Sequence, residues 1–118
     1  MSRGTCSELF PMASMATLLE FPSGWCCYLL LCSDGSYYCG ITSDLAGRIR
    51  DHSSGKGSGY TKGFKPISLV WYESHSNRHS AAERERQIKS WNHDKKRGLA
   101  EGEKRYLGMG KRMMVSLG

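Results

Sequence analysis

A carboxylate in an amphipathic segment is the strongest single indication in this sequence of a metal-binding or catalytic residue. Glu85 lies four residues after Ala81 and three before Ile88, so in a helix its carboxylate sits on or beside the apolar stripe. A carboxylate turned toward a core needs a paired cation, a metal ion or a raised pKa. Two interpretations follow: Glu85 is a ligand for a divalent cation, or it forms an ion pair with Lys89 one turn later.

A guanidinium and an imidazole share the face of another predicted helix. Arg48 and His52 are four residues apart, next to the apolar residues Leu45 and Ile49. An arginine at the edge of a core is suited to bidentate contact with a phosphate, and a histidine can move a proton near neutral pH. The alternative is an ordinary solvated helix face.

Two tyrosines lie on neighbouring predicted strands, and the turn between them decides whether their hydroxyls meet. A two-residue turn would place Tyr28 and Tyr38 on opposite faces of the hairpin, because successive side chains alternate. A three-residue turn over residues 33–35, with Gly35 at positive φ, sets Gly40 opposite Tyr28. We predict the three-residue turn, which puts both hydroxyls on one face and leaves room over Tyr28.

A basic, glycine-rich segment over residues 55–66 is of the kind that lies along phosphates, although a flexible connector has the same composition. Its three lysines come without an acidic residue among them. The residues that we expect to contact nucleic acid are Lys56, Tyr60, Lys62, Lys65, Arg84 and Lys89.

The remaining pattern predicts one domain over residues 25–100, between a loose leader at 1–24 and a basic tail containing glycine and methionine at 101–118. We expect strands at 25–32, 36–42 and 67–73. Helices are expected at 45–54, with Asp44 as N-cap, at 78–91 and at 94–100.

The composition favours a polyanionic partner and a reducing compartment. Lys and Arg number 17 against 11 Asp and Glu, which gives a net charge of +6 and a pI near 9.2. Five cysteines without a C-x-x-C pair indicate neither a disulfide framework nor a zinc ribbon, and buried free thiols are expected. The sequence shows no membrane-spanning run and no secretory signal, so we expect an intracellular protein, cytoplasmic or nuclear, with an organelle as an open alternative.

The ordered set of these residues resembles a known family. Tyr28 is followed by Tyr38-Cys39-Gly40-Ile41-Thr42, then by Asp44-Leu45-x-x-Arg48 and His52, and last by Glu85-x-x-x-Lys89. This pattern resembles the GIY-YIG nuclease domain. The stretch Ser54-Gly55-Lys56-Gly57, followed by Tyr60-Thr61 and by the closing Ile88-Lys89-Ser90-Trp91, resembles its small, stand-alone members. The sequence departs from the name motif, because Cys26-Cys27-Tyr28 stands for Gly-Ile-Tyr and Cys39 stands for the second isoleucine.

The resemblance implies an α/β (α+β) sandwich in which helices flank a three-stranded antiparallel sheet. It further implies one divalent cation, Mg²⁺ or Mn²⁺, held by Glu85, and an Arg48 that neutralises charge on the transition state. Tyr28 or Tyr38 would deprotonate the attacking water, with His52 in support. The expected activity is metal-dependent hydrolysis of a phosphodiester in DNA, with a structure-directed or weakly sequence-specific cut of the kind used in repair or recombination.

Two other functions fit the same sequence. A non-catalytic nucleic-acid-binding module would keep the scaffold and the basic surface, and the altered first triplet favours it. A small interaction domain would dock a partner protein through the helix from residue 78. A nuclease with one site also needs a partner protein or a homodimer to cut both strands of a duplex.

Overall fold

The computed structural model describes residues 21–53 and 65–117 of the chain, except the side chains of residues 52 and 53. Its elements are β2 (Ser23–Cys32), β3 (Tyr37–Asp44), α2 (Leu45–Ser53), β4 (Pro66–Ser74), α3 (Arg78–Lys89), α4 (His93–Ala100), α5 (Lys104–Leu107) and β5 (Lys111–Ser116). The predicted helices and strands are therefore present, with ends that differ by one or two residues. None of the described helices has the length and apolar character needed to cross a membrane.

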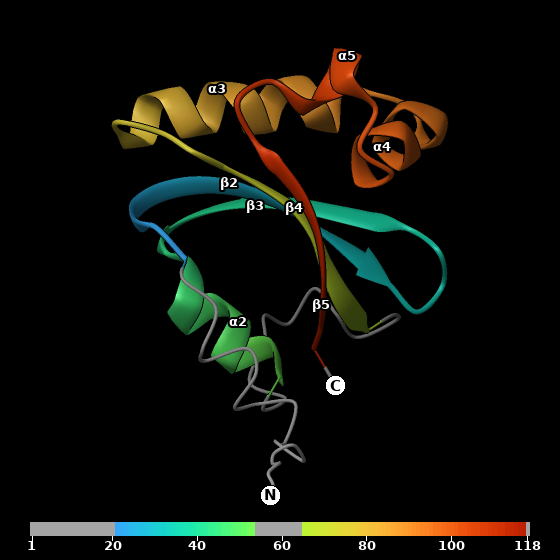
Figure 1. Ribbon diagram of the computed structural model, residues 1–118, viewed down its shortest axis with the longest axis horizontal. Helices are drawn as coiled ribbons and strands as arrows, with labels where there is room; N and C mark the ends of the chain where they lie inside the picture. Colours follow the sequence, from blue (N-terminus) through green and yellow to red (C-terminus); the bar gives the residue numbers. More distant parts are fainter. Residues whose placement is uncertain (1–20, 54–64, 118) are drawn as a thin grey trace, which may run out of the picture.

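A four-stranded antiparallel sheet with the order β3-β2-β4-β5 separates two layers of helices. Figure 1 shows α3, α4 and α5 on one face and α2 on the other. On the α2 face, Leu45 and Ile49 pack against residues of β2 and β4. On the opposite face, Ile88 and Leu99 pack against Trp71 and its neighbours. The central strand β2 is thus buried from both sides, which explains its nearly continuous apolar sequence.

The β2–β3 hairpin has the predicted three-residue turn. Cys32 N–H donates to the carbonyl of Ser36 at 2.8 Å, and Gly35 has a φ of 85°. Tyr28 accordingly pairs with Gly40 in the antiparallel register. The prediction that Tyr28 and Tyr38 share a face is confirmed, since both contact the core cluster on the α2 side.

The sheet has a fourth strand that we did not predict from the sequence. Residues 104–116 form α5 and β5 rather than a tail, and β5 pairs antiparallel with β4. Met113, Val115 and Leu117 alternate toward the core, as a half-buried strand requires. Met114 lies between them and is 64% exposed. Because this exposed residue is apolar, the alternation of apolar and polar residues along the strand was not visible in the sequence.

The start of the domain also differs slightly from the prediction. Ser23 and Gly24, assigned to the leader, belong to β2, whereas residues 1–20 lie outside the described part of the chain. The basic segment 55–66 lies outside it as well, except for Lys65 and Pro66. Four cysteines within the described ranges are free and buried, as expected.

We expect Leu117→Ala to lower the free energy of unfolding by about 2 to 5 kcal/mol, because Leu117 is 2% exposed and its removal leaves a cavity. The matched control Met114→Ala should stay within about 0.5 kcal/mol of the wild type. Urea denaturation measures both. Two equally small effects would contradict a packed terminal strand.

Candidate functional site

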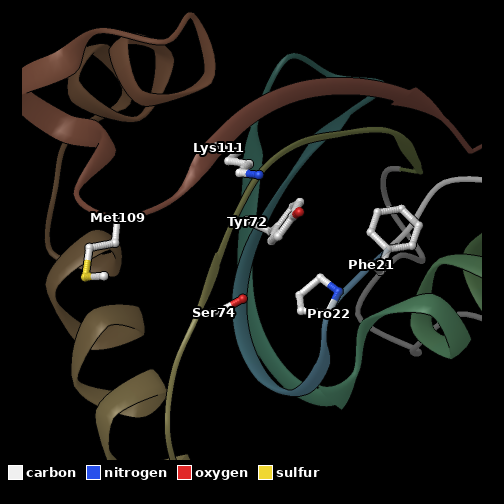
Figure 2. A pocket seen from close by; sticks show the side chains of 6 residues that line it. All are labelled: Phe21, Pro22, Tyr72, Ser74, Met109 and Lys111. Atoms are coloured by element: carbon white, nitrogen blue, oxygen red, sulfur yellow. The ribbon is translucent and has the colours of Figure 1, made fainter.

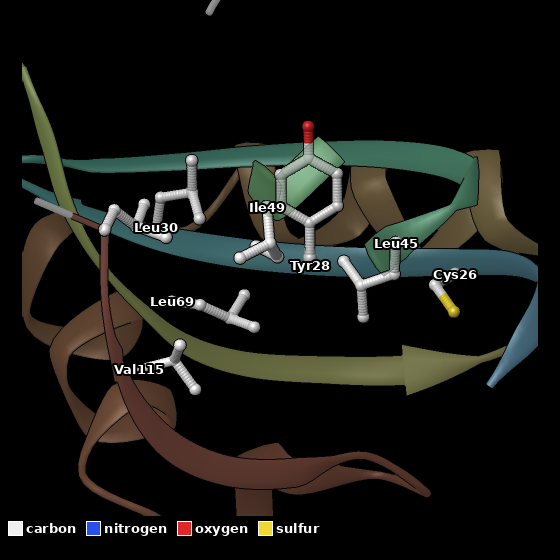
Figure 3. Packing of buried hydrophobic residues seen from close by; sticks show 8 residues of the cluster. Cys26, Tyr28, Leu30, Leu45, Ile49, Leu69 and Val115 are labelled. Carbon is white, nitrogen blue, oxygen red and sulfur yellow. The ribbon is translucent and has the colours of Figure 1, made fainter. Parts of the chain in front are cut away.

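Tyr28 and Tyr38 form a close pair over a glycine. Their ring centroids are 6.3 Å apart with an interplanar angle of 52°. A Cβ atom at position 40 would lie 2.7 Å from Tyr28 Oη and 3.0 Å from Tyr38 Cε2, so only glycine leaves both rings in place. In Figure 3 the hydroxyl of Tyr28 points away from the apolar residues around its ring. The two phenol rings therefore lie close together over the backbone of Gly40.

The surroundings of Tyr28 favour its neutral form. The side chain is 2% exposed, and burial is the largest cause of a pKa well above the usual range. Tyr38 and the negative charge of Glu85 raise this pKa further, whereas the positive charge of Arg48 lowers it. At neutral pH Tyr28 is accordingly a phenol that can donate a hydrogen bond.

Helix α2 positions Arg48 on the same face of the sheet. The helix starts where Asp44 Oδ1 accepts a hydrogen bond from Gly47 N–H at 3.0 Å, which confirms Asp44 as the N-cap. Leu45 and Ile49 are 0% and 1% exposed and fix the apolar side of the helix. Arg48 remains exposed and lines a shallow pocket of about 250 Å³. Its guanidinium is thus available to an anionic ligand near Tyr28.

Glu85 lies on α3, across the sheet from α2. Its neighbours on the helix, Ala81 and Ile88, are fully buried, and its own side chain is 22% exposed. Lys89 Nζ lies 3.2 Å from Glu85 Oε2. The ion pair considered from the sequence is therefore present, and Glu85 also affects the titration of Tyr28.

The donor set fits a cation that takes few protein ligands. Within the described ranges, no group of three His, Cys, Asp or Glu residues could hold a metal ion. Mg²⁺ usually binds one or two carboxylates and completes its shell with water and substrate phosphate. Glu85, with a partly exposed carboxylate near Tyr28, matches this single-carboxylate pattern.

Arg84 does not have the position expected of a nucleic-acid contact. Its Nε lies 3.2 Å from Glu73 Oε1, and its Nη2 donates to the carbonyl of Tyr106 at 2.6 Å. The guanidinium lies 5.3 Å from the centroid of the Trp71 ring and 5.6 Å from that of Trp91. The side chain is only 13% exposed. The expectation that Arg84 contacts DNA is therefore corrected, and Arg84 is a structural residue.

The partner of Arg84 belongs to a buried polar cluster that the sequence analysis missed. Glu73 is 5% exposed, and its carboxylate also accepts from Met109 N–H at 2.9 Å. His75 Nε2 lies 2.8 Å from the same carboxylate. A signal was available in the sequence, because Glu73 follows Trp71 by two residues and so points to the same face of β4.

The other predicted contacts are spread over the chain. Lys65 is exposed beside the hairpin turn, where its carbonyl accepts from Ser33 N–H at 2.7 Å. Ser33 follows Tyr28 by five positions, a distance of roughly 16 Å along the strand. Lys89 is half exposed next to Glu85. Lys56, Tyr60, Lys62 and the side chain of His52 lie outside the described residues.

The altered first triplet is accommodated without a change of register. Cys26 and Cys27 are both fully buried, and they belong to the clusters on opposite faces of the sheet. Cys27 Sγ lies 3.6 Å from Cys39 Sγ, so two of the three substituted motif positions contact each other. Tyr28 still pairs with Gly40.

A family model and similar sequences indicate the family of this chain. A family model described as the GIY-YIG catalytic domain matches residues 24–98. A UPF0213 protein of Haloquadratum walsbyi is 45% identical over 74 residues, which cover 63% of this chain and 83% of that protein. A UPF0213 protein of Vibrio cholerae is 38% identical over 89 residues, or 75% of this chain and 88% of that protein. The solution NMR structure of a UPF0213 protein from Bacillus halodurans is 34% identical and matches with a TM-score of 0.42, covering 71% of this chain and 92% of that one.

We expect Arg84→Gln to lower the free energy of unfolding by about 3 to 5 kcal/mol, because it leaves the buried Glu73 carboxylate without its cation. Arg86→Gln removes the same charge from an exposed position of the same helix and should have little effect. Urea denaturation of the two variants measures the difference. Equal stabilities would mean that Arg84 is not part of the packed structure.

The raised pKa of Tyr28 predicts a loss of stability at alkaline pH. Since the folded-state pKa exceeds the unfolded value of about 10, the contribution of Tyr28 is complete below pH 10 and is lost as the pH rises further. Between pH 8 and 11 the wild type should therefore lose more unfolding free energy than Tyr28→Phe. The other titratable residues are the same in both proteins, so their contributions cancel in the comparison. Parallel pH profiles would contradict the burial of a neutral phenol.

Proposed function

This chain belongs to the GIY-YIG family as a small UPF0213 member, and we propose that it is a divalent-cation-dependent nuclease that hydrolyses a phosphodiester bond in DNA. One observation carries the proposal. Two phenols meet over Gly40 while the charges of Arg48 and Glu85, from opposite layers, both act on Tyr28. A carboxylate can hold a metal ion, a guanidinium can stabilise an anionic transition state and a phenol can move a proton, and each of these contributes to phosphodiester hydrolysis.

The two tyrosines divide the proton chemistry. Tyr28 is buried and neutral, so it donates a hydrogen bond that orients the attacking water or a phosphate oxygen. Tyr38 is only partly buried, so part of its side chain is accessible to solvent. We assign to Tyr38 a proton relay in which its hydroxyl oxygen accepts the proton of the attacking water while its own proton passes to His52 or to bulk water.

We assign to Arg48 and Glu85 the stabilisation of the negative charge on the phosphate and on the leaving oxygen. Arg48 places a guanidinium next to the phosphate, where it stabilises the negative charge that builds up in the transition state. Glu85 would hold the Mg²⁺ or Mn²⁺ ion, and such an ion, when bound, stabilises charge on the leaving oxygen. Lys89 already neutralises Glu85 in part, so it is placed to move from the carboxylate to a phosphate.

The DNA contacts follow from the charge distribution of the chain. Lys65 lies beside the β2–β3 turn and Lys89 lies beside Glu85; both lysines are exposed, and we assign phosphate contacts to both. Lys56, Tyr60 and Lys62 in the basic segment complete the proposed DNA surface. One site cuts one strand, so a cut through both strands of a duplex requires a homodimer, a partner protein or a second visit.

The test is cleavage of a panel of branched, flapped, nicked and intact duplex DNA with Mg²⁺ or Mn²⁺. Glu85→Gln should abolish cleavage and leave DNA binding intact, whereas Glu83→Gln, an exposed carboxylate on the same helix, should cleave like the wild type. Arg48→Gln should lower the rate on the order of 10²- to 10³-fold, as expected for a preorganised electrostatic contact. Arg50→Gln is the control for loss of one positive charge on α2.

The non-catalytic alternative gives a different result in the same assay. A binding module would bind DNA with a steep salt dependence, and neither divalent cations nor Glu85→Gln would change what happens to the DNA. An intact panel across pH 6 to 9 with either cation would refute the nuclease and leave that module.

A further inference from the structure

One row of paired residues crosses the whole sheet on the face of the two tyrosines. Gly40 of β3 pairs with Tyr28 of β2, Tyr28 pairs with Tyr72 of β4, and Tyr72 pairs with Lys111 of β5. Directly opposed residues point to the same face of a sheet. Tyr72 and Lys111 therefore extend the row of Tyr28 toward the edge strand β5.

A pocket of about 310 Å³ occupies this end of the row. Its lining residues are Phe21, Pro22, Tyr72, Ser74, Met109 and Lys111. Figure 2 shows the ring of Tyr72 between Lys111 on one side and Pro22 and Ser74 on the other. The Phe21 and Tyr72 rings meet edge to face, with centroids 6.1 Å apart. Helix α2 packs over β2 and β3, so the pocket lies on the half of this face that α2 leaves open.

The chemistry of the lining combines aromatic rings with one available cation. Tyr72 and Phe21 are partly buried, so each ring presents some surface to the pocket. Lys111 is exposed, and among residues 21–53 and 65–117 no carboxylate lies within ion-pair distance of its ammonium group. The hydroxyl of Ser74 adds a hydrogen-bonding group at the rim. Stacking surface and a phosphate-binding cation are the two elements by which proteins hold single-stranded nucleic acid.

We propose that this pocket binds an unpaired nucleotide of the DNA substrate, with its base against Tyr72 and Phe21 and its phosphate on Lys111. The proposal rests on the proposed function, because the occupant is part of the DNA that the enzyme would cut. It defines the substrate class as DNA in which a duplex adjoins a single-stranded segment.

Duplex DNA alone does not meet the requirements of the pocket. Bases inside a duplex are stacked on their neighbours, so their faces are not available to an aromatic side chain, whereas an unpaired base has a free face. The distance across the sheet from Gly40 to Lys111 also suits a short single-stranded segment. Three strand spacings separate Gly40 from Lys111, which is about 14 Å, or about four stacked nucleotide steps of roughly 3.4 Å.

The test measures binding without a divalent cation, so that it does not depend on cleavage. Fluorescence anisotropy in EDTA compares a duplex that carries a five-nucleotide overhang with the same duplex without one. The wild type should prefer the overhang, and Tyr72→Leu should weaken overhang binding by about 5- to 150-fold, the range for one stacked base. Tyr72→Phe keeps the ring and should retain the preference.

Matched controls separate the pocket from general effects. Tyr37→Leu removes a partly buried tyrosine from the opposite face of the sheet and should leave the preference unchanged. Lys111→Gln should lower the slope of the logarithm of affinity against the logarithm of salt by about one for the overhang, whereas Lys104→Gln, an exposed lysine on α5, should not change the preference. Thermal unfolding shows whether each variant is folded. Equal affinities of the wild type for the two DNAs, or equal losses in pocket and control variants, would overturn the proposal.

Photocrosslinking locates the nucleotide in the unaltered protein. An overhang that contains 5-iodouracil should crosslink under ultraviolet light to a peptide with Phe21 or Tyr72, identified by mass spectrometry. Crosslinks confined to other peptides would refute the pocket even if overhangs bind well. If the crosslink forms but the DNA panel stays intact with Mg²⁺ or Mn²⁺, the nuclease proposal fails and the nucleotide pocket remains.

Discussion

The number of residues in the β2–β3 turn is the constraint on which the site depends. Side chains alternate along each strand, so a turn shorter by one residue would send Tyr38 to the α3 face of the sheet. Gly35 provides the positive φ that closes the longer turn, and Tyr28 then faces Gly40. Strand β2 also pairs with β4, where Tyr28 lies opposite Tyr72. The two tyrosines therefore lie on the same face of the sheet. One turn and one central strand thereby align the tyrosine pair and the pocket.

The edge position of β3 explains how residues from both layers act on one phenol. Glu85 belongs to α3, which packs over β2 and β3 on the face opposite to α2. If another strand lay outside β3, it would stand between the Glu85 carboxylate and the Tyr28 hydroxyl. Beside an edge strand, and beside Gly40, which has no side chain, the charges of Glu85 and Arg48 both reach the Tyr28 hydroxyl. The tyrosine pair is therefore at the edge of the sheet, between the two layers of helices.

The sequence predicted those parts of the structure that depend on local patterns. Asp44 as a helix cap, the three-residue turn and the stripe of Ala81 and Ile88 beside Glu85 are decided within a few residues of each other. Strand β5 and the role of Arg84 depend instead on tertiary contacts. The exposed Met114 interrupts the alternation of β5, and nothing near Arg84 in the sequence indicates that Glu73 would enclose its charge.

The corrected role of Arg84 bears on DNA binding in an indirect way. Through Glu73 it joins α3 to β4, and Glu73 in turn accepts a hydrogen bond from Met109 N–H just before β5. Lys111 is only two residues further along the chain, so the same cluster fixes where β5 begins and where that lysine pairs with Tyr72. An arginine first expected to touch the phosphate backbone therefore holds in place the strand that carries the proposed phosphate-binding lysine. A buried ion pair suits this purpose, because it requires one defined geometry to offset the desolvation of both charges.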